Sequence, residues 1–139
     1  MSSYKVDIFT PSSVVAKELS AKSLLVPTTR GQINLLEDHT HMITKLATGI
    51  LTVTDGNSET HFSMTTGVCK ILNDKVTILS AVTEQAHEID FERAKAALEK
   101  AQEKLKSDSL TDLQLIKYRR KIERAEVRIK MAYLGKGAP

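Results

Sequence analysis

The sequence predicts an α+β fold in which an N-terminal antiparallel β-sandwich is followed by a C-terminal antiparallel two-helix hairpin. Residues 1–86 contain short apolar runs that turn residues interrupt often, a pattern typical of an antiparallel sandwich or barrel. Residues 87–139 instead repeat their apolar residues every three or four positions, which is typical of paired helices. We therefore expect two domains, residues 1–86 and residues 87–139.

The first domain is expected to contain three separate strands and two hairpins. The separate strands are predicted over residues 4–9, 24–26 and 33–35, and Pro27 should end the second of them. The hairpins are predicted over residues 50–64, with a turn at Asp55-Gly56-Asn57, and over residues 68–79, with a turn at Asn73-Asp74. An Asp-Gly pair favours a tight hairpin because it tolerates the positive φ angles of such a turn.

The second domain is expected to form two helices that pack along an apolar seam. The seam residues are Phe91, Ala94, Leu98, Ala101 and Leu105 in the first helix and Leu115, Tyr118, Ile122, Ala125, Ile129 and Ala132 in the second. If the numbers of facing residues add up to 216, every layer pairs apolar with apolar, beginning with Phe91 against Ala125. Burial contributes about 0.8 kcal/mol per CH₂ group, so a seam rich in alanine is weakly held and the hairpin is predicted to open.

The ends of these helices are predicted from capping residues. Asp90 suits the N-cap of the first helix, and Ser109 followed by Asp112 suits the start of the second. Gly135 and Gly137 should end the second helix, because glycine adopts the left-handed conformation that terminates many helices.

The composition indicates a globular chain with unevenly distributed charge. Of 139 residues, 41% are hydrophobic and 27% are charged. Residues 1–86 carry seven Lys/Arg and eight Asp/Glu, whereas residues 87–139 carry thirteen Lys/Arg and nine Asp/Glu. The basic second domain points to an acidic partner, a phosphate ligand or nucleic acid. The low aromatic content and the lack of base-stacking motifs argue against nucleic acid.

Targeting and cysteine chemistry give further expectations. The N-terminal residues lack a basic stretch followed by an apolar one, and no apolar run approaches the ~20 residues of a membrane-spanning helix. We therefore expect neither a signal peptide nor a membrane span. Cys69 is the one cysteine and stands in an apolar stretch, so we expect a buried structural thiol in a reducing compartment.

No recognised catalytic motif is present in the sequence, which lacks a phosphate-binding glycine loop, a Gly-x-Ser-x-Gly segment and a cysteine pair. His39 and His41 could place two imidazoles on one face of a strand, but no third ligand stands at a metal-like spacing. Near His39, the turn that contains Glu37 and Asp38 could hold an acid–base pair, but nothing nearby supplies a nucleophile. We expect no catalytic residue and no metal site, and a small hydrolase remains only an alternative.

The better candidate site is basic. Arg124 and Arg128 are four residues apart and project from one face of the second helix. The predicted pairing places them beside Arg93, with Asp90 and Glu84 close by in the chain. Guanidinium groups bind phosphate oxygens in bidentate fashion, and a carboxylate accepts hydrogen bonds from a sugar hydroxyl or a base amine. These residues could therefore form a nucleotide pocket when the hairpin folds.

The alternative is a solvated face crossed by ion pairs. In that arrangement Arg93 would pair with Glu123, and Arg124 would pair with Glu92. The residues alone leave both interpretations open.

At this point the sequence resembles a known family. The segment Ile89-Asp90-Phe91-Glu92-Arg93-Ala94 resembles the Ile/Leu-Asp-x-x-Arg-Ala motif of the epsilon subunits of bacterial F-type ATP synthases. Residues 6–11 resemble the first strand of that family, residues 48–51 its central strand, and residues 66–69 the turn and strand that follow. Arg124-Ala125 with Arg128 resembles the second-helix part of the family's ATP site. The resemblance covers the whole chain.

The resemblance implies a rotor subunit that is not itself an enzyme. Its sandwich would bind the gamma subunit and the membrane-embedded c-ring, and so help to couple proton transport to ATP synthesis. Its hairpin would lie compact or extend toward the alpha/beta catalytic head, where its basic residues would block ATP hydrolysis. The implied location is the cytoplasmic side of the bacterial plasma membrane, peripheral through the complex, with no nucleic acid as partner.

The resemblance also implies two sets of site residues. A regulatory ATP site, with no metal required, would comprise Glu84, Ile89, Asp90, Arg93, Ala94, Arg124 and Arg128. Contacts with the rotor ring and stalk would come from Gln32, Asp38 and His39. This loop departs from the family pattern, because Gln32 replaces an acid, Asn34 a glycine and Glu37 a proline. A different class of function remains as the alternative, a coiled-coil adaptor that binds an acidic protein and no nucleotide.

Overall fold

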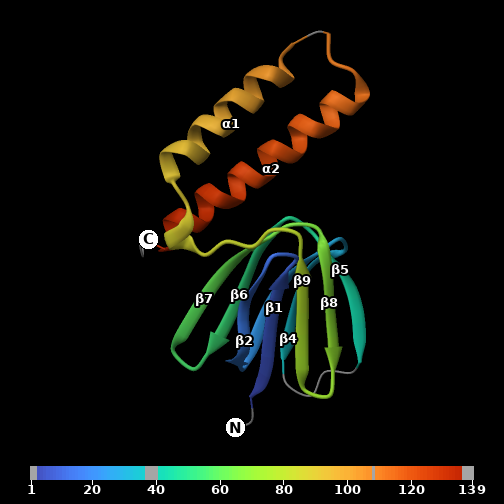
Figure 1. Cartoon of the computed structure of the whole chain (residues 1–139), viewed down its shortest axis with the longest axis vertical. Coiled ribbons are helices and arrows are strands. Elements are labelled where there is room, and N and C mark those ends of the chain that lie inside the picture. The colour runs from blue at the N-terminus through green and yellow to red at the C-terminus, as the bar shows by residue number, and fades with distance from the viewer. Residues whose placement is uncertain (1–2, 37–40, 108, 136–139) are drawn as a thin grey trace. The chain divides into compact units, whose positions relative to one another are not determined.

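The computed structural model of the chain describes residues 3–36, 41–107 and 109–135 (Figure 1). The chain divides into two compact units, residues 1–84 and residues 85–139, here named the β-unit and the hairpin unit. The strands of the β-unit are β1 (Tyr4–Thr10), β2 (Ser13–Ala21), β3 (Ser23–Thr28), β4 (Gly31–Leu36), β5 (Met42–Leu46), β6 (Gly49–Asp55), β7 (Ser58–Met64), β8 (Gly67–Leu72) and β9 (Lys75–Ser80). The hairpin unit contains one turn of 3₁₀ helix, η1 (Ala86–Glu88), and the helices α1 (Phe91–Leu105) and α2 (Asp112–Gly135).

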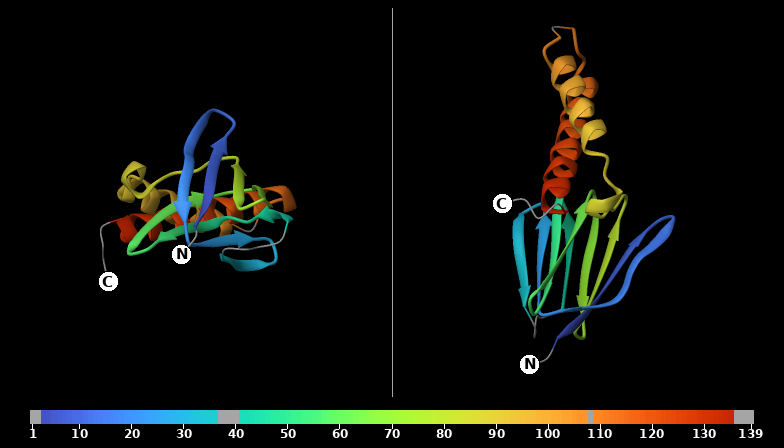
Figure 2. Two further views of the ribbon diagram at one scale, coloured as in Figure 1. Left: turned by 90° about the horizontal axis from the view of Figure 1, so that it is seen from below. Right: turned by 90° about the vertical axis from the view of Figure 1, so that its left-hand side faces the viewer.

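The strands of the β-unit form one continuous sheet that folds over into a sandwich, so the predicted fold class is confirmed (Figure 2). The strand order is β2-β1-β9-β8-β5-β3-β6-β7, and β4 pairs with β3. Both predicted hairpins, β6–β7 and β8–β9, are present. One pair departs from the antiparallel prediction, because β1 and β9 run parallel, with Val6 opposite Val76. Alternation of apolar residues shows that a segment is a strand but not the direction of its neighbour.

The prediction that Pro27 ends a strand is wrong, because β3 continues through it to Thr28. Pro27 pairs with Gln32 on β4, and its carbonyl accepts a hydrogen bond from the Ala47 amide at 3.0 Å. On its other edge β3 pairs with β6 only as far as Leu25 and with β5 only at Thr28. Proline lacks an amide hydrogen, so it fits the corner where one neighbouring strand gives way to the next.

Two strands, β2 and β5, were not predicted, because neither shows alternating apolar and polar residues in its sequence. Pairing between β1 and β2 shifts register twice, and Glu18 adopts a positive φ of 56°. An irregularity of this kind moves side chains off the alternating pattern. In β5, the apolar Ile43 is 70% exposed, whereas the polar Thr44 beside it is half-buried. Apolar character therefore does not show which face of this strand points inward.

The core of the β-unit lies between the two layers of the sandwich. Val6 and Ile8 of β1 and Leu51 and Phe62 of β6 and β7 belong to this core, and all four are buried. Cys69 belongs to this core, which confirms the predicted buried thiol, and burial raises its pKa to about 11. A thiol with so high a pKa is protonated at neutral pH and is a poor nucleophile.

In the hairpin unit the predicted first helix is confirmed and the start of the second is corrected. Asp90 is the N-cap of α1, where its carboxylate accepts a hydrogen bond from the Arg93 amide at 3.1 Å. The cap of α2 is Thr111, not Ser109. Its hydroxyl accepts from the Gln114 amide at 3.2 Å, and the Gln114 side chain accepts from the Thr111 amide at 2.9 Å. This reciprocal pair is a capping box, which satisfies two amides at once.

The hairpin buries alanines of the predicted seam and also Met131, which was not predicted, and its register differs from the prediction. Ala94, Ala101, Ala125 and Ala132 are buried. The ring of Phe91, however, packs edge-on against Tyr133 at 5.4 Å between centroids, not beside Ala125. The predicted sum of 216 is therefore wrong: the ring contact gives a sum of 224, which is within one residue of 223, the sum that keeps the apolar layers paired. A sum of 223 differs from the prediction by seven, one heptad, which leaves apolar residues facing apolar residues.

Candidate functional site

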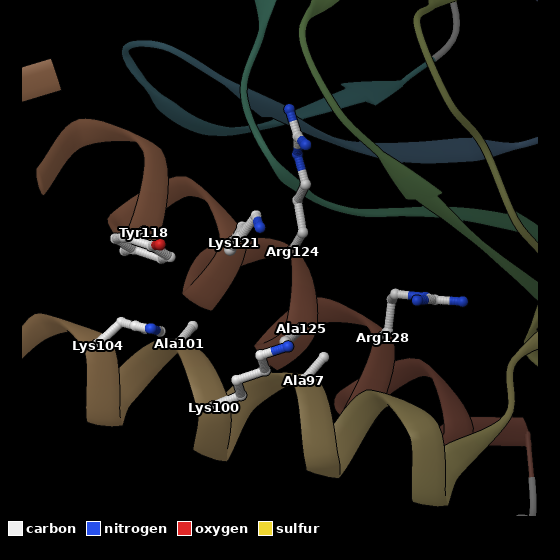
Figure 3. A pocket seen from close by; sticks show the side chains of 9 residues that line it. All are labelled: Ala97, Lys100, Ala101, Lys104, Tyr118, Lys121, Arg124, Ala125 and Arg128. Carbon is white, nitrogen blue, oxygen red and sulfur yellow. The ribbon is translucent and has the colours of Figure 1, made fainter. Parts of the chain in front are cut away.

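A basic groove of ≈ 490 Å³ runs between the two helices of the hairpin unit (Figure 3). Ala97, Ala101 and Ala125 lie between the helices and form its floor. Its remaining lining residues are Lys100 and Lys104 from α1 and Tyr118, Lys121, Arg124 and Arg128 from α2. Small floor residues bring the helices close together, while the long basic side chains remain at the rim.

The cations of this groove face few counter-charges. No carboxylate lines it among the described residues. Within the described part of the chain, Lys100, Lys104 and Arg124 form no ion pair. The ammonium of Lys121 lies 5.5 Å from the centre of the Tyr118 ring, within the range of a cation–π contact. The groove therefore has a strongly positive electrostatic potential, which suits an anionic ligand.

Two of the residues predicted for the ATP site, Arg124 and Arg128, line this groove. Neither Arg93 nor Asp90 lines the groove. In a register near a sum of 223, Arg124 faces residue 99 in place of residue 92, which moves it away from the first turn of α1, whereas Arg128 faces residue 95 and stays beside that turn. Neither of the two ion pairs of the alternative prediction, Arg93 with Glu123 or Arg124 with Glu92, forms in the structure.

The remaining predicted ATP-site residues of the hairpin unit surround the start of α1. Ile89 follows η1, and Asp90 holds the first turn of α1 through the Arg93 amide. The Arg93 side chain is exposed, whereas Ala94 is buried. Asp90 thus already performs a structural task as a helix cap.

Glu84 is the last residue of the β-unit, where backbone hydrogen bonds hold it. Its amide donates to the Ser63 hydroxyl at 2.8 Å, and its carbonyl accepts from the Ser63 amide at 2.9 Å. Just before it, the Val82 amide donates to the Thr65 hydroxyl at 3.1 Å. The segment after β9 is therefore tied to the end of β7 up to Glu84.

The residues predicted to face the rotor are only partly within the described structure. Gln32 is exposed on β4, opposite Pro27 of β3. Asp38 and His39 lie outside the described residues. His41 directly precedes β5 and is exposed.

The other residues considered for chemistry have structural settings. His61 pairs across the sheet with Thr52, whose hydroxyl lies 2.9 Å from Nδ1, and its Nε2 lies 3.2 Å from a Glu59 oxygen. Among the described residues no group of three or more His, Cys, Asp or Glu is placed to hold a metal ion. The described helices include none with the length and apolar character of a bilayer span.

The sequence prediction missed three of the groove's lysines, Lys100, Lys104 and Lys121. A signal for them was present. Lys100 and Lys104 are four apart, and Lys121, Arg124 and Arg128 follow one another at three and four. The cations of each helix lie beside its apolar seam, and the two groups face the same groove. A comparison of the two flanks would have identified a shared basic groove.

The fold and the groove together define the class of protein, a β-sandwich followed by a cationic helical hairpin. A model described as the beta-sandwich domain of the ATP synthase Delta/Epsilon chain matches residues 3–86, and one described as its long alpha-helix domain matches residues 87–132. The chain therefore belongs to the ATP synthase epsilon chain family.

Relatives in bacteria agree with this assignment. The chain is 34% identical over 128 residues to an ATP synthase epsilon chain of Geotalea uraniireducens, covering 92% of each chain. It is 31% identical over 134 residues to that of Staphylococcus haemolyticus, covering 96% of this chain and 99% of the relative.

Solved structures show the same fold at lower identity. A chain of the mitochondrial ATP synthase of Euglena gracilis, in a structure of OSCP, F1 and the c-ring, matches with a TM-score of 0.81 at 22% identity, covering 94% of this chain and 81% of that one. A chain of the Tetrahymena thermophila enzyme, in a structure of the central stalk and c-ring, matches with a TM-score of 0.54 at 12% identity, covering 94% of each.

Proposed function

We propose that the chain is a non-catalytic rotor subunit of an F-type ATP synthase, one that binds the gamma subunit and the c-ring through its β-unit. The match of both family models, in order and over nearly the whole chain, carries this proposal. The solved structures with the same fold come from F1, c-ring and central-stalk assemblies. By this role the chain couples proton transport to ATP synthesis from a peripheral position on the cytoplasmic side of a bacterial plasma membrane.

We further propose that the hairpin unit regulates the motor. Four of the eleven seam residues are alanine, so the hairpin buries less apolar surface than a seam of larger side chains would, and its two helices separate more readily. When they extend toward the alpha/beta head, the basic face of α2 reaches acidic surfaces there and opposes ATP hydrolysis. ATP, bound by the predicted set of residues from Glu84 to Arg128, favours the compact form. A ligand shifts such an equilibrium only by binding one form more tightly than the other.

The coupling role is tested by deleting residues 87–139 from the assembled synthase. The shortened subunit should still copurify with gamma and the c-ring, and ATP hydrolysis by the complex should rise. Loss of copurification of the full-length chain with gamma would favour the adaptor alternative. Unchanged hydrolysis after the deletion would remove the inhibitory role and leave the coupling role.

The ATP-sensing role has a separate test on the purified chain. Millimolar ATP should raise the melting temperature of the wild-type chain, because a ligand of the folded state stabilises it. Arg93→Ala with Arg124→Ala should abolish the effect. Wild-type melting that ATP leaves unchanged would eliminate the sensor while leaving the rotor assignment intact.

A further inference from the structure

The β-unit has a hollow of its own, of ≈ 580 Å³, lined by residues of β4, of β5 and of the turn before β4. Thr28 pairs with Gly31 of β4 along one edge and with Leu46 of β5 along the other. Next to these pairs, the Thr29 amide donates to the Lys45 carbonyl at 3.2 Å. Away from this end, β4 and β5 do not pair with each other within the described strands. The hollow is therefore closed where the strands meet.

The closed end of the hollow is cationic. Arg30 and Lys45 both line it, and Arg30 follows Thr29, whose amide is bonded to Lys45. The Thr28 hydroxyl accepts a hydrogen bond from the Arg30 amide at 3.2 Å, which holds the backbone of this turn. Neither cation forms an ion pair with a described residue, and no described carboxylate lines the hollow. This end is suited to the oxygens of a small anion.

The rest of the hollow is largely apolar. Ile33 and Leu35 of β4 and Met42 and Ile43 of β5 line it. Because β4 runs away from the closed end and β5 runs toward it, both strands place these side chains beyond the cations. Three residues of extended strand separate Met42 from Lys45, a distance of about 10 Å. Charge and apolar surface are thus separated along one hollow.

We propose that this hollow binds a single-chain anionic amphiphile, namely a medium-chain fatty carboxylate. Its carboxylate would contact Arg30 and Lys45, since a guanidinium fork binds the two oxygens of a carboxylate together. Its acyl chain would lie against Ile33, Met42 and Ile43, where burial of CH₂ groups favours binding. The volume of ≈ 580 Å³ is within the range of small-molecule sites, roughly 300–1,000 Å³.

An acyl chain fits this hollow better than a peptide strand. A peptide that adds to a sheet lies along an exposed edge and forms main-chain hydrogen bonds with it. β5 offers such an edge for only a few residues, because Leu46 already pairs with Thr28 and the Lys45 carbonyl is already bonded to Thr29. A flexible chain that ends in a carboxylate needs no such edge.

The site is separate from the hairpin unit and goes beyond the proposed rotor role. Every residue that forms it belongs to the β-unit. A position at a membrane, which is itself a proposal, would bring the hollow near a source of fatty acids. Binding to the purified chain does not depend on that position, so failure of one proposal is distinguishable from failure of the other.

The first test varies the ligand and measures its binding to the full-length chain by isothermal titration calorimetry, below micelle-forming concentrations. Octanoate, decanoate and dodecanoate should bind with affinities that rise about fourfold for each CH₂ group that the hollow buries. Decyltrimethylammonium has an apolar chain of the same length and the opposite charge, and should bind at least about tenfold more weakly than decanoate. An affinity independent of chain length, or equal for the two head groups, would overturn the proposal.

The second test removes the cations. Arg30→Gln with Lys45→Gln should weaken decanoate binding by at least about tenfold, since the charge-assisted bonds are lost. The matched control Lys5→Gln with Lys70→Gln makes the same change of net charge at exposed positions outside the hollow, and should stay within about twofold of wild type. An equal loss in both variants would show non-specific attraction and overturn the assignment.

Conservative replacement guards against a folding artefact. Arg30→Lys with Lys45→Arg keeps both charges and should bind decanoate more tightly than the glutamine pair does. If it bound no better while far-UV circular dichroism showed an intact sheet, the charge argument would be wrong.

The third test shortens the apolar wall at a position that the fold tolerates. Ile43 is 70% exposed, so Ile43→Ser should leave the sheet intact while weakening decanoate binding by at least about threefold. Leu79→Ser is the control, because Leu79 is 52% exposed on β9 and does not line the hollow. Equal weakening by the two variants would place the acyl chain elsewhere on the sheet and overturn the proposal.

A competing occupant is measured in the same way. The peptide acetyl-Glu-Val-Glu-Val carries acidic and apolar side chains in alternation, as a strand added to β5 would. It should bind more weakly than decanoate. Tighter binding of the peptide would overturn the proposal in favour of a protein strand.

Discussion

The absence of a side chain at Gly67 and at Gly49 lets neighbouring residues of the sandwich pack closely. A Cβ added at Gly67 would lie 1.9 Å from the backbone oxygen of Leu79 on the neighbouring strand. At Gly49 it would lie 2.7 Å from Cβ of Pro27. The glycines of the Thr-Gly pairs at 48–49 and 66–67, which are part of the family resemblance, thus have a steric reason.

The Gly67→Ala substitution should destabilise the chain more than Gly49→Ala. The backbone of β9 cannot retreat without breaking its pairing with β8, whereas the side-chain ring of Pro27 can shift slightly while β3 stays paired. Overpacking of this kind typically costs about 1–3 kcal/mol, and occasionally more. We expect Gly67→Ala at or above the top of that range and Gly49→Ala within it. Urea unfolding monitored by circular dichroism measures both. Equal stability of Gly67→Ala and wild type would show that the β8–β9 approach is looser than described.

Asp7 is a buried carboxylate that holds the irregular part of β2. Its Oδ1 accepts the Glu18 amide at 2.8 Å, and its Oδ2 lies 3.1 Å from the Lys75 ammonium. The hydrogen bond from the Glu18 backbone, followed by Lys75, lowers the pKa of Asp7. The positive φ of Glu18 points its amide at the carboxylate, so one acid compensates for a strained turn of the strand.

Stability should therefore decrease in acid, and Asp7→Asn should remove part of that decrease. Because the folded-state pKa lies below the unfolded value of about 3.9, the contribution is present above that value and is lost as pH falls through the folded pKa. At neutral pH the variant should lose roughly 1–3 kcal/mol, since an amide replaces a charged acceptor. Urea unfolding at neutral pH and near pH ~3 tests this. Glu18→Gln, an exposed partner of Lys75, is the control and should change little.

Among the elements, the helices show what a sequence pattern can and cannot predict. The seam residues of α1 and α2, and the Asp90 cap, were predictable because period and capping are local. The register was not, because a heptad pattern is unchanged by a shift of seven residues. The groove depends on this register, so its membership, with Lys100 in place of Arg93, could not be obtained from the pattern alone.

Cysteine pairs can distinguish the two registers. In a Cys69→Ser background, Leu98→Cys with Ala125→Cys places the two thiols in one layer of the observed register. Leu98→Cys with Tyr118→Cys does so in the predicted register. The two α2 positions are seven residues apart, about 10 Å along the helix, so only one pair can satisfy disulfide geometry. We expect the first pair to oxidise readily in the isolated chain. Preferential oxidation of the second would restore the original prediction.

In the sheet, too, the elements that were not predicted are those whose structure depends on residues distant in sequence. β2 contains register shifts, and β5 exposes Ile43, so neither shows the pattern that revealed β6 to β9. The end of β3 was misjudged because the space that receives Pro27 is created by Gly49, which is distant in sequence. Such compensation between remote residues is not visible in a local pattern.

For the whole molecule, the division into two units follows the hydrogen bonds after β9. Glu84 is bound to Ser63 through both its amide and its carbonyl, and Val82 is bound to Thr65. The sequence indicated two parts with different periods. It did not indicate that the segment after β9 is fastened to the end of β7, because serine and threonine hydroxyls bind backbone amides in many contexts.

A fragment of residues 1–84 should fold by itself with a cooperative transition, because its buried core lies within the β-unit. A fragment that ends at Ser80 lacks the bonds to Ser63 and Thr65 and should be less stable by about 1–3 kcal/mol. Denaturant unfolding of both fragments measures the difference. If the two fragments were equally stable, the bonds after β9 would contribute nothing to the β-unit.

The parallel pairing of β1 with β9 has a consequence for how the chain is made. Synthesis on the ribosome begins at the N-terminus, yet the edge of β1 that pairs with β9 has no partner until residues 75–79 have emerged from the ribosome. Until then that edge of the β1–β2 hairpin stays unpaired, and pairings between segments distant in sequence form slowly. During translation, newly exposed edges of this kind are where nascent chains meet chaperones or one another.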